Sequence, residues 1–493
     1  MPTLPIYCAS AIRRLEGRAR GARLMDRAGL AAAERARSLC GDTAKSVLVL
    51  AGPGNNGGDA FEAAAHLKNW FFRVTAVFCG ERDGLPEDAK RALAKWEAAG
   101  GTLLEDIPDG ARFDLAIDGL FGIGLKRPLE GRHRAIVGKL NALRIPVLSL
   151  DVPSGLDADT GAVMGCAVRA AHTLTFIAYK PGLLTLDGPD HCGEVELDTL
   201  GLDPPALLEP DGGLLDADIL PAAVAPRPRN FHKGMAGSVG VLGGASGMVG
   251  AAVIAARAAL RCGAGRVYLG MLAARPPRVD TENPELMLRE PRALLEKGLL
   301  DALVVGPGMG KAAPSAKALR AALAAPLTLV LDADALNLIA ASSALASAVG
   351  KRAAATVMTP HPAEAARLLG DNTRRVQSDR VAAAKEIARR YRSFALLKGN
   401  GSVIAEPRGR FWINTSGNPG MASAGMGDAL AGIVAALCAQ GTVPLSALLA
   451  GTWLHGAAAD ALAAAGAGPV GITASEVIDS ARALINAARR PPP

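Results

Sequence analysis

The sequence predicts an α/β protein built from two tandem domains. Short β-rich runs alternate with helical stretches along both halves of the chain, a pattern typical of parallel sheets covered by helices. The 493 residues are 50% hydrophobic and 20% charged, which is an ordinary globular balance. A proline-rich stretch, residues 201–229, contains no long periodic segment and separates the two halves. We therefore expect one domain at residues 1–210 and a second at 211–493.

In the first half, five apolar runs have the length and composition of buried strands. They are Ser46–Ala51, Arg73–Cys79, Phe113–Asp118, Pro146–Asp151 and His172–Ala178. Helical patterns fall between them at Gly58–Phe71, Glu87–Ala99 and Arg132–Leu143. Because parallel strands need crossover connections, we expect this half to form a Rossmann-like sheet domain of three layers.

The second half repeats the alternation. Strands are expected at Ser238–Gly243, Arg266–Gly270, Ala302–Val305, Leu327–Asp332, Ala354–Thr359 and Phe394–Leu397, with a hairpin at Ser402–Ala405 and Arg410–Asn414. Ala429–Ala459 contains no Asp, Glu, Lys or Arg, but Gln440–Pro444 breaks it into pieces too short to cross a membrane. Two buried helices are the better interpretation.

The amino-acid composition indicates which kinds of molecule the protein binds. The 54 basic and 47 acidic residues leave a net charge of +7, and the basic residues are scattered rather than grouped. Stacking platforms for nucleic acid are scarce, since the chain has 10 Phe, 4 Trp and 4 Tyr. The 7 cysteines are widely spaced and the N-terminus resembles no signal peptide. We expect a cytoplasmic protein that binds anionic small molecules and neither nucleic acid nor membrane.

The first chemical signal is the loop Gly52–Asp59, which follows the strand Ser46–Ala51 and contains G-x-G-x-x-G. That spacing is typical of dinucleotide binding. However, Asn55 and Asn56 occupy the variable positions, and the carboxylate of Asp59 would repel a pyrophosphate. The loop is better suited to a cation or a polar substrate. A plain glycine turn, with Asp59 capping the following helix, remains the alternative.

Two further loops follow strands of the same predicted sheet, at Asp118–Leu125 and Asp151–Asp157. The carboxyl ends of parallel strands share one edge of a sheet, so the polar side chains of the three loops are expected to converge. These side chains are Asn56, Asp59, Asp118, Asp151 and Ser154. Because they offer oxygen ligands without His or Cys, they favour a hard cation.

The sequences GNNGGD (54–59), DGLFGIGL (118–125) and SLDVPSGLDADTG (149–161), preceded by LMDRAG (24–29), resemble the NAD(P)H-hydrate epimerase domain. The resemblance covers about residues 1–205. It implies a catalytic role for Asp151 and a potassium ion held by Asn56, Asp118 and Ser154. The implied substrate contacts are Asn55, Asn56, Gly57, Gly58, Asp59, Gly122, Ile123, Gly124, Leu125, Lys126, Arg127, Pro128 and Asp151. Ile123 and Ala60 depart from the family, which has Thr and Gly at these positions.

In the second half, the strongest chemical signal is Gly417–Asp428, a run of small residues that leads into a long apolar helix. Such a run exposes backbone N–H groups that form an anion hole for a transferring phosphoryl group. Asp428 is positioned to act as a base toward a substrate hydroxyl, with a helix N-cap as the alternative role. Gly306–Lys311 is not a Walker loop, because Val305 and Ala312 stand where glycine and a hydroxyl residue are needed.

This arrangement resembles the ribokinase superfamily and, within it, the ADP-dependent NAD(P)H-hydrate dehydratase. The matching segments are KGMAGSVGVLGGASGMVGAA, VVGPGMG, LDADALN, TPHPAE, LLKGNGS and GNPGMASAGMGD, within about 225–490. The resemblance implies substrate contacts at Ala251, Gly308, His361 and Asp428, with Asp428 catalytic. It implies contacts to ADP, bound with magnesium, at Lys398, Gly399, Asn400, Gly401, Ser402 and Gly427. Met426 replaces the family's Thr.

Together the two resemblances imply one bifunctional repair enzyme for hydrated NADH and NADPH. The first domain would interconvert the R and S hydrates, and the second would dehydrate the S form with ADP. Two other hypotheses stay open: the first domain as a non-catalytic binding module, and the second as a kinase for a small alcohol or vitamin. A homo-oligomer is also expected.

Overall fold

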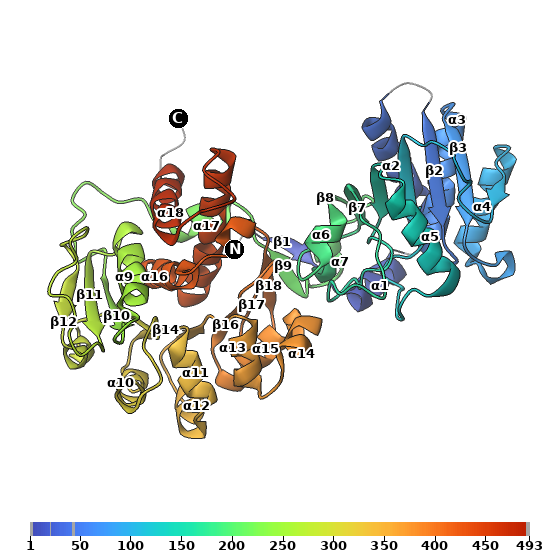
Figure 1. Cartoon of the computed structure of the whole chain (residues 1–493). Coiled ribbons are helices and arrows are strands. Elements are labelled where there is room, and N and C mark those ends of the chain that lie inside the picture. Colours follow the sequence, from blue (N-terminus) through green and yellow to red (C-terminus); the bar gives the residue numbers. More distant parts are fainter. Residues whose placement is uncertain (1–2, 20, 42–44, 490–493) are drawn as a thin grey trace. The chain divides into compact units, whose positions relative to one another are not determined.

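The computed structural model describes residues 3–19, 21–41 and 45–489 of the chain. It contains two compact units, Pro5–Gly212 and Gly213–Pro493, the larger of which also includes the N-terminal residues up to Leu4 (Figure 1). The division between them falls inside the proline-rich stretch. Each unit has its own sheet and its own helices, which confirms the predicted α/β class.

The smaller unit contains a parallel sheet of seven strands in the order β4-β3-β2-β5-β6-β7-β8. The strands are β2 (Ser46–Ala51), β3 (Arg73–Phe78), β4 (Leu103–Leu104), β5 (Leu115–Gly119), β6 (Val147–Leu150), β7 (His172–Phe176) and β8 (Glu194–Asp198). From β2 the chain continues to β3 and β4 on one side of β2, and it then returns to form β5 on the other side. This reversal is a topological switch point, where α/β folds bind their ligands.

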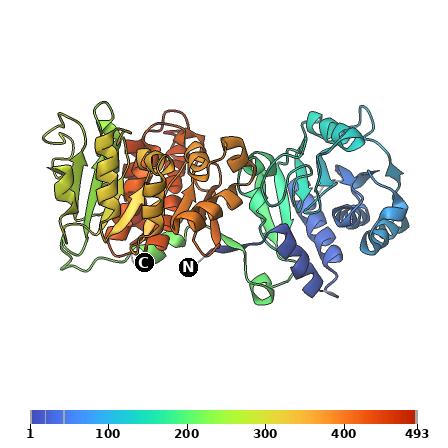
Figure 2. The same ribbon diagram turned by 90° about the horizontal axis from the view of Figure 1, so that it is seen from below.

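Helices cover both faces of this sheet (Figures 1 and 2). The helices of this unit are α1 (Ala9–Arg18), α2 (Leu24–Cys40), α3 (Asn55–Asn69), α4 (Glu87–Ala98), α5 (Gly131–Ala142) and the short α6 (Gly188–Cys192) and α7 (Pro204–Leu207). Along β2, Val49 lies in one core with Phe61 of α3, whereas Leu50 lies in a second core with Ile136 of α5. The alternating side chains of β2 thus enter two cores, which confirms the three-layer arrangement.

The larger unit is built on a mixed sheet in the order β1-β9-β18-β17-β16-β15-β14-β13-β10-β11-β12, in which β1 and β9 lie at the division between the two units. Its strands are β1 (Leu4–Ile6), β9 (Gly212–Leu214), β10 (Ser238–Gly243), β11 (Arg266–Met271), β12 (Met287–Arg289), β13 (Ala302–Val305), β14 (Thr328–Leu331), β15 (Thr356–Met358), β16 (Phe394–Leu397), β17 (Ser402–Ala405) and β18 (Phe411–Asn414). Strands β10 to β16 pair in parallel, β16 pairs antiparallel with β17, and β17 and β18 form the expected hairpin. The switch point of this sheet lies between β10 and β13.

The uncharged stretch near the C-terminus forms the buried pair α16 (Met426–Ala439) and α17 (Pro444–Ala464), as expected. In α16, a Cβ at Gly432 would lie 2.1 Å from the backbone oxygen of Ala255 in α9 (Val249–Arg261), so glycine permits this close helix contact. The unit's helices are α8 (Ile219–Ala223), α9 (Val249–Arg261), α10 (Ala313–Leu323), α11 (Asp334–Ala340), α12 (Ser343–Gly350), α13 (Pro362–Leu369), α14 (Thr373–Ser378), α15 (Arg380–Tyr391), α16, α17 and α18 (Ala474–Ala488). Within the described residues, no helix has the length and apolarity needed to cross a bilayer.

Candidate active sites

A cavity of about 760 Å³ lies at the carboxyl ends of β2, β5 and β6 in the smaller unit. The predicted loops converge there as expected. The predicted residues that line it are Asn55, Asn56, Asp59, Gly122, Ile123, Gly124, Leu125 and Asp151. Sequence reasoning missed helix α1, which contributes Arg13 and Glu16 to the lining of the cavity.

Asp151 enters the cavity from a left-handed backbone position, with φ at 64°. Its carboxylate accepts a hydrogen bond from the ammonium of Lys180, whose side chain is fully buried. That ammonium also donates to the Thr175 hydroxyl at 2.9 Å and to the Phe176 carbonyl at 2.6 Å. The backbone amide of Ile123 donates to the other carboxylate oxygen at 3.4 Å. Asp151 is therefore held as an ion-paired carboxylate by a lysine that sequence reasoning overlooked.

Two other carboxyl groups of this cavity have raised pKa values. Burial, followed by the negative charges of Asp151 and Glu16, raises the pKa of Asp59 well above its usual range. Burial and the charge of Asp151 likewise raise the pKa of Glu16. The cavity thus combines an ion-paired carboxylate with two carboxyl groups of raised pKa, an arrangement suited to acid–base chemistry.

Asp118, Ser154 and Asn56 are buried close to this cavity. Asp118 Oδ1 accepts from the Ser154 hydroxyl at 2.6 Å, and its Oδ2 accepts from the Ser149 hydroxyl at 2.8 Å. The carboxamide of Asn56 is buried, and neither its oxygen nor its nitrogen has a hydrogen-bond partner among the described residues. A Cβ at Gly122 would lie 3.4 Å from Asn56 Oδ1, so this carboxamide faces the loop after β5.

Some predicted residues of the first site do not line this cavity. Of the described residues, Gly57, Gly58 and Lys126–Pro128 are not among those that line the cavity. The two glycines serve packing, because a Cβ at Gly57 would lie 2.0 Å from the Gly52 carbonyl oxygen and one at Gly58 would meet Met25 at 2.6 Å. Helix α3 begins at Asn55, three residues before the expected start. Its N-cap is Gly54, so Asp59 lies in the second turn and the capping alternative is wrong.

The second cavity, of about 440 Å³, lies at the carboxyl ends of β10, β13, β14 and β15 in the larger unit. It surrounds the switch point between β10 and β13. The residues that line it are Gly247, Met248, Gly250, Ala251, Gly308, Ala333, Asp334, Asn337, Glu364 and Asp428. Three of the four predicted substrate contacts, Ala251, Gly308 and Asp428, are therefore brought together here.

Asp428 lies in the first turn of α16, whose N-cap is Gly425 with φ at 90°. The N-cap alternative for Asp428 is therefore wrong. Burial and then the negative charge of Asp332 raise the pKa of Asp428 to about 7, although the Lys398 ammonium lowers it. A carboxyl with this pKa can gain and lose a proton near neutral pH, which is what a general base has to do during the reaction.

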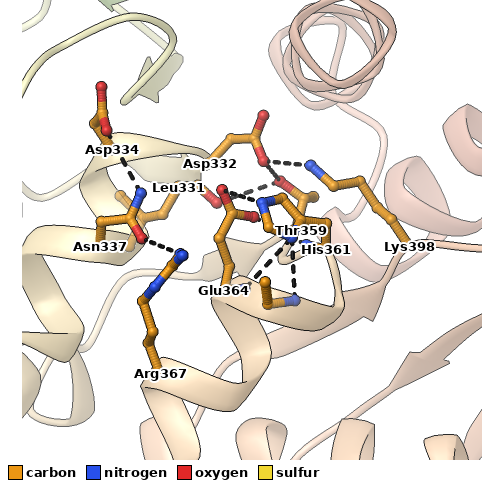
Figure 3. Close-up of polar contacts among 10 residues, drawn as sticks. Leu331, Asp332, Asp334, Asn337, Thr359, His361, Glu364, Arg367 and Lys398 are labelled. Carbon is orange, nitrogen blue, oxygen red and sulfur yellow. Dashed lines mark hydrogen bonds and ion pairs between the residues drawn. The ribbon is translucent and has the colours of Figure 1, made fainter. Parts of the chain in front are cut away.

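Asp332, Lys398 and Thr359 form a polar network at the ends of neighbouring strands (Figure 3). Asp332 Oδ1 accepts from Lys398 Nζ at 2.7 Å and from the Thr359 hydroxyl at 2.8 Å. Burial alone would lower the pKa of Lys398, but the charges of Asp332 and Glu364 raise it above its ordinary value. Lys398, predicted to contact ADP, thus carries a positive charge within this acidic network.

His361 and Glu364 form a capping box at the start of α13 (Figure 3). His361 Nδ1 accepts from the Glu364 amide at 3.4 Å, and Glu364 Oε2 accepts from the His361 amide at 2.9 Å. Burial raises the pKa of Glu364 to about 7. Among the described residues, Glu364 lines the cavity and His361 does not. Sequence reasoning missed Glu364 and Asp332, although both lie in the segments TPHPAE and LDADALN.

Two family models match this chain. Residues 239–481 match the family described as NAD(P)H-hydrate dehydratase, and residues 21–182 match the family described as YjeF-related protein N-terminus. The bifunctional NAD(P)H-hydrate repair enzyme of Escherichia coli strain K12 is 39% identical over 468 residues, which cover 94% of this chain and 89% of that protein. The chain belongs to the family of bifunctional NAD(P)H-hydrate repair enzymes. This confirms the family expected from the sequence.

Solved structures resemble the larger unit of this family member. A ribokinase-like superfamily protein of Enterococcus faecalis V583 is 25% identical, with a TM-score of 0.50, and covers 57% of this chain and 98% of that chain. The ADP/ATP-dependent NAD(P)H-hydrate dehydratase of Bacillus subtilis, co-crystallised with ATP and Mg²⁺, is 27% identical, with a TM-score of 0.49. The match covers 56% of this chain and 98% of that chain. The likeness to the Enterococcus faecalis protein confirms the ribokinase-like fold expected for this part of the chain.

Proposed function

We propose that the two units catalyse successive reactions on hydrated NADH and NADPH. The smaller unit interconverts the R and S hydrates, and the larger unit dehydrates the S hydrate at the expense of ADP. The observation that carries this proposal is the pair of separate cavities, each with its own acid–base carboxyl groups at the carboxyl edge of its own sheet. Dehydration removes the S hydrate and so draws the R hydrate through the first reaction.

In the smaller unit, exchange of the epimers requires the carbon–oxygen bond of the hydrate to break and to re-form on the opposite face of the ring. Asp59 or Glu16, whose pKa values are raised, donates the proton to the departing hydroxyl. Asp151, oriented by Lys180, takes a proton from the incoming water. One water leaves and one is added, so the exchange needs no further reactant.

Asn56, Asp118 and Ser154 fit the potassium ion that the family resemblance implies. The buried Asn56 carboxamide oxygen has no hydrogen-bond partner among the described residues, and Asp118 supplies a buried carboxylate. Oxygen donors of this kind suit a hard monovalent cation. When bound, the ion would supply positive charge to a site that takes an anionic substrate.

In the larger unit, Asp428 accepts the proton of the ring hydroxyl while the hydroxyl oxygen attacks the β-phosphorus of ADP. An oxygen–phosphorus bond forms, and the bond to AMP breaks. The phosphate ester then loses inorganic phosphate and a ring proton, which restores the double bond. Backbone amides at the start of α16 face the transferring phosphoryl group, and Lys398–Ser402 with Gly427 bind the rest of the nucleotide.

Glu364 and Asp428 fit the magnesium ion expected with ADP. Both carboxyls line the second cavity, and the negative charge of Glu364 contributes to the raised pKa of Asp428. A divalent cation held by these two carboxyls would offset this repulsion. When bound, it would neutralise charge on the phosphates. The cation would thus leave Asp428 in the ionised form that a base requires.

Product stoichiometry tests the proposed function of the larger unit. With pure S hydrate and ADP, we expect one AMP and one phosphate for each NADH formed. The competing hypothesis is a kinase for a small alcohol or vitamin, which would instead accumulate a stable phosphorylated alcohol. Detection of such an ester with no NADH produced from the S hydrate would overturn the proposal.

A further inference from the structure

Arg380, at the start of α15, lies buried behind the loop Lys398–Ser402, with an exposed fraction of 1%. Its Nη2 donates to the carbonyl oxygens of Leu397 and Lys398, both at 3.3 Å, and to that of Gly401 at 3.5 Å. Its Nη1 donates to Gln377 Oε1 at 2.6 Å. One guanidinium therefore holds both the beginning and the end of the turn between β16 and β17.

The loop is shaped around this guanidinium. Gly399 adopts φ of +145°, and a Cβ at this position would lie 2.8 Å from Arg380 Nη2. The Ser402 hydroxyl closes the turn by donating to the Gly399 carbonyl at 2.9 Å and accepting from its amide at 3.2 Å. Because the guanidinium is planar and its donors are fixed in direction, it sets the orientation of these carbonyl groups.

We propose that Arg380 is a positioning residue for the nucleotide: it fixes the shape of the loop Lys398–Ser402 and places a positive charge behind it. The inference rests on the proposed role of this loop in binding ADP. Burial lowers the pKa of Arg380 to about 10, so the guanidinium remains charged at neutral pH. A positive charge behind the loop favours an anionic ligand in front of it.

The chain offers a matched control in Arg352, which is also bonded to backbone carbonyls. Arg352 donates to the carbonyl oxygens of Ala325 at 3.1 Å and Leu327 at 2.6 Å, and to the Thr356 hydroxyl at 3.0 Å. These partners lie at the amino ends of β14 and β15, away from the nucleotide loop. Replacing Arg352 thus removes comparable bonds without touching the loop.

The test measures KM for ADP, KM for the S hydrate and kcat in the full-length enzyme. Arg380→Gln should raise KM for ADP about 10-fold or more, because it removes hydrogen bonds from a charged donor. KM for the hydrate should stay within about twofold. Arg380→Lys keeps the charge but loses the planar fork, so we expect a smaller rise. Arg352→Gln should lower Tm without changing either KM.

Two outcomes would contradict the proposal, and a further variant separates them. Asn400→Trp adds bulk at an exposed position of the loop and should raise KM for ADP directly. If Asn400→Trp raises KM for ADP while folded Arg380→Gln leaves it unchanged, the proposed role of Arg380 is wrong. If Asn400→Trp also has no effect, the loop does not bind ADP and the underlying assignment fails as well. Should Arg380→Gln not fold, Arg380→Lys decides by the same comparison.

Discussion

At the scale of single residues, the protonation of Asp428 should govern the pH dependence of dehydration. A base works only when deprotonated, and burial raises the pKa of this carboxyl to about 7. We therefore expect kcat/KM for the S hydrate to rise with pH and to level off by about pH 7, because a bound magnesium ion would offset part of the repulsion that raises this pKa. Initial rates at saturating ADP and magnesium between about pH 5.5 and 9 measure this. A flat profile across that range would remove Asp428 from the role of base.

Asn56 offers the most direct residue-level test of the potassium site. Its carboxamide has no hydrogen-bond partner among the described residues, so Asn56→Ala should leave the fold intact while weakening the cation site. We expect R-to-S exchange by the wild type to depend on potassium and to be unaffected by a chelator of transition metals. Asn56→Ala should lose most of the response to potassium. The control is Ser149→Ala, which removes a hydrogen bond to Asp118 but no proposed ligand. An equal response in wild type and Asn56→Ala would count against the site.

Sequence reasoning found the site residues that follow strands and missed those that tertiary packing recruits. Asp118, Asp151 and Asp428 belong to glycine-containing sequence motifs, whose composition itself indicates function. Lys180 and Glu16 carry no such signal. A single lysine or glutamate in an ordinary stretch looks like a surface residue until the fold buries it beside a carboxylate.

At the scale of elements, the close contact between α16 and α9 depends on Gly432. Alanine normally favours a helix over glycine by about 1 kcal/mol. At Gly432 the added Cβ would lie 2.1 Å from the Ala255 carbonyl oxygen, so the helices would have to separate. We expect Gly432→Ala to destabilise the protein by about 1–3 kcal/mol. Gly138→Ala in α5 is the control, because a Cβ there meets nothing within 4 Å and should stabilise. Thermal unfolding measures both, and a higher Tm for Gly432→Ala would refute the packing argument.

The central strands could be predicted from the sequence, but the short edge strands could not. β2, β10, β13 and β16 begin and end at the expected residues, because each is an apolar run bounded by turn residues. β4, β9 and β12 have two or three residues each. So short a segment has no periodicity, and its strand conformation depends on the neighbour with which it pairs.

At the scale of the whole molecule, we predict that the larger unit works without the smaller one. A fragment of residues 213–493 keeps the second cavity and its hydrophobic core, and loses the edge strand β1. It should convert the S hydrate to NADH with ADP and leave the R hydrate to slow spontaneous exchange. Product formation from each pure epimer measures this. A folded fragment that fails on the S hydrate would show that the second site needs the rest of the chain.

The organisation into two α/β units could be predicted because the alternation of strands and helices restarts after the proline-rich stretch. The assignment of the N-terminal strand could not. β1 comes first in the chain, yet it stands beside β9 at the end of the larger unit's sheet. Only long-range strand pairing decides this, and three residues of sequence carry no information about a partner about 200 residues away.

Complementation between two variants tests the central claim, that one chain carries two separate activities. Asp151→Asn should block epimer exchange, and Asp428→Asn should slow dehydration about 10²–10⁴-fold. Supplied with pure R hydrate and ADP, neither variant alone should form NADH faster than spontaneous exchange allows, whereas an equimolar mixture should recover the coupled reaction. The S hydrate provides the control, since Asp151→Asn should still dehydrate it. NADH formation by either variant alone at the wild-type rate, or a mixture of folded variants that stays inactive, would contradict two sites with separate roles.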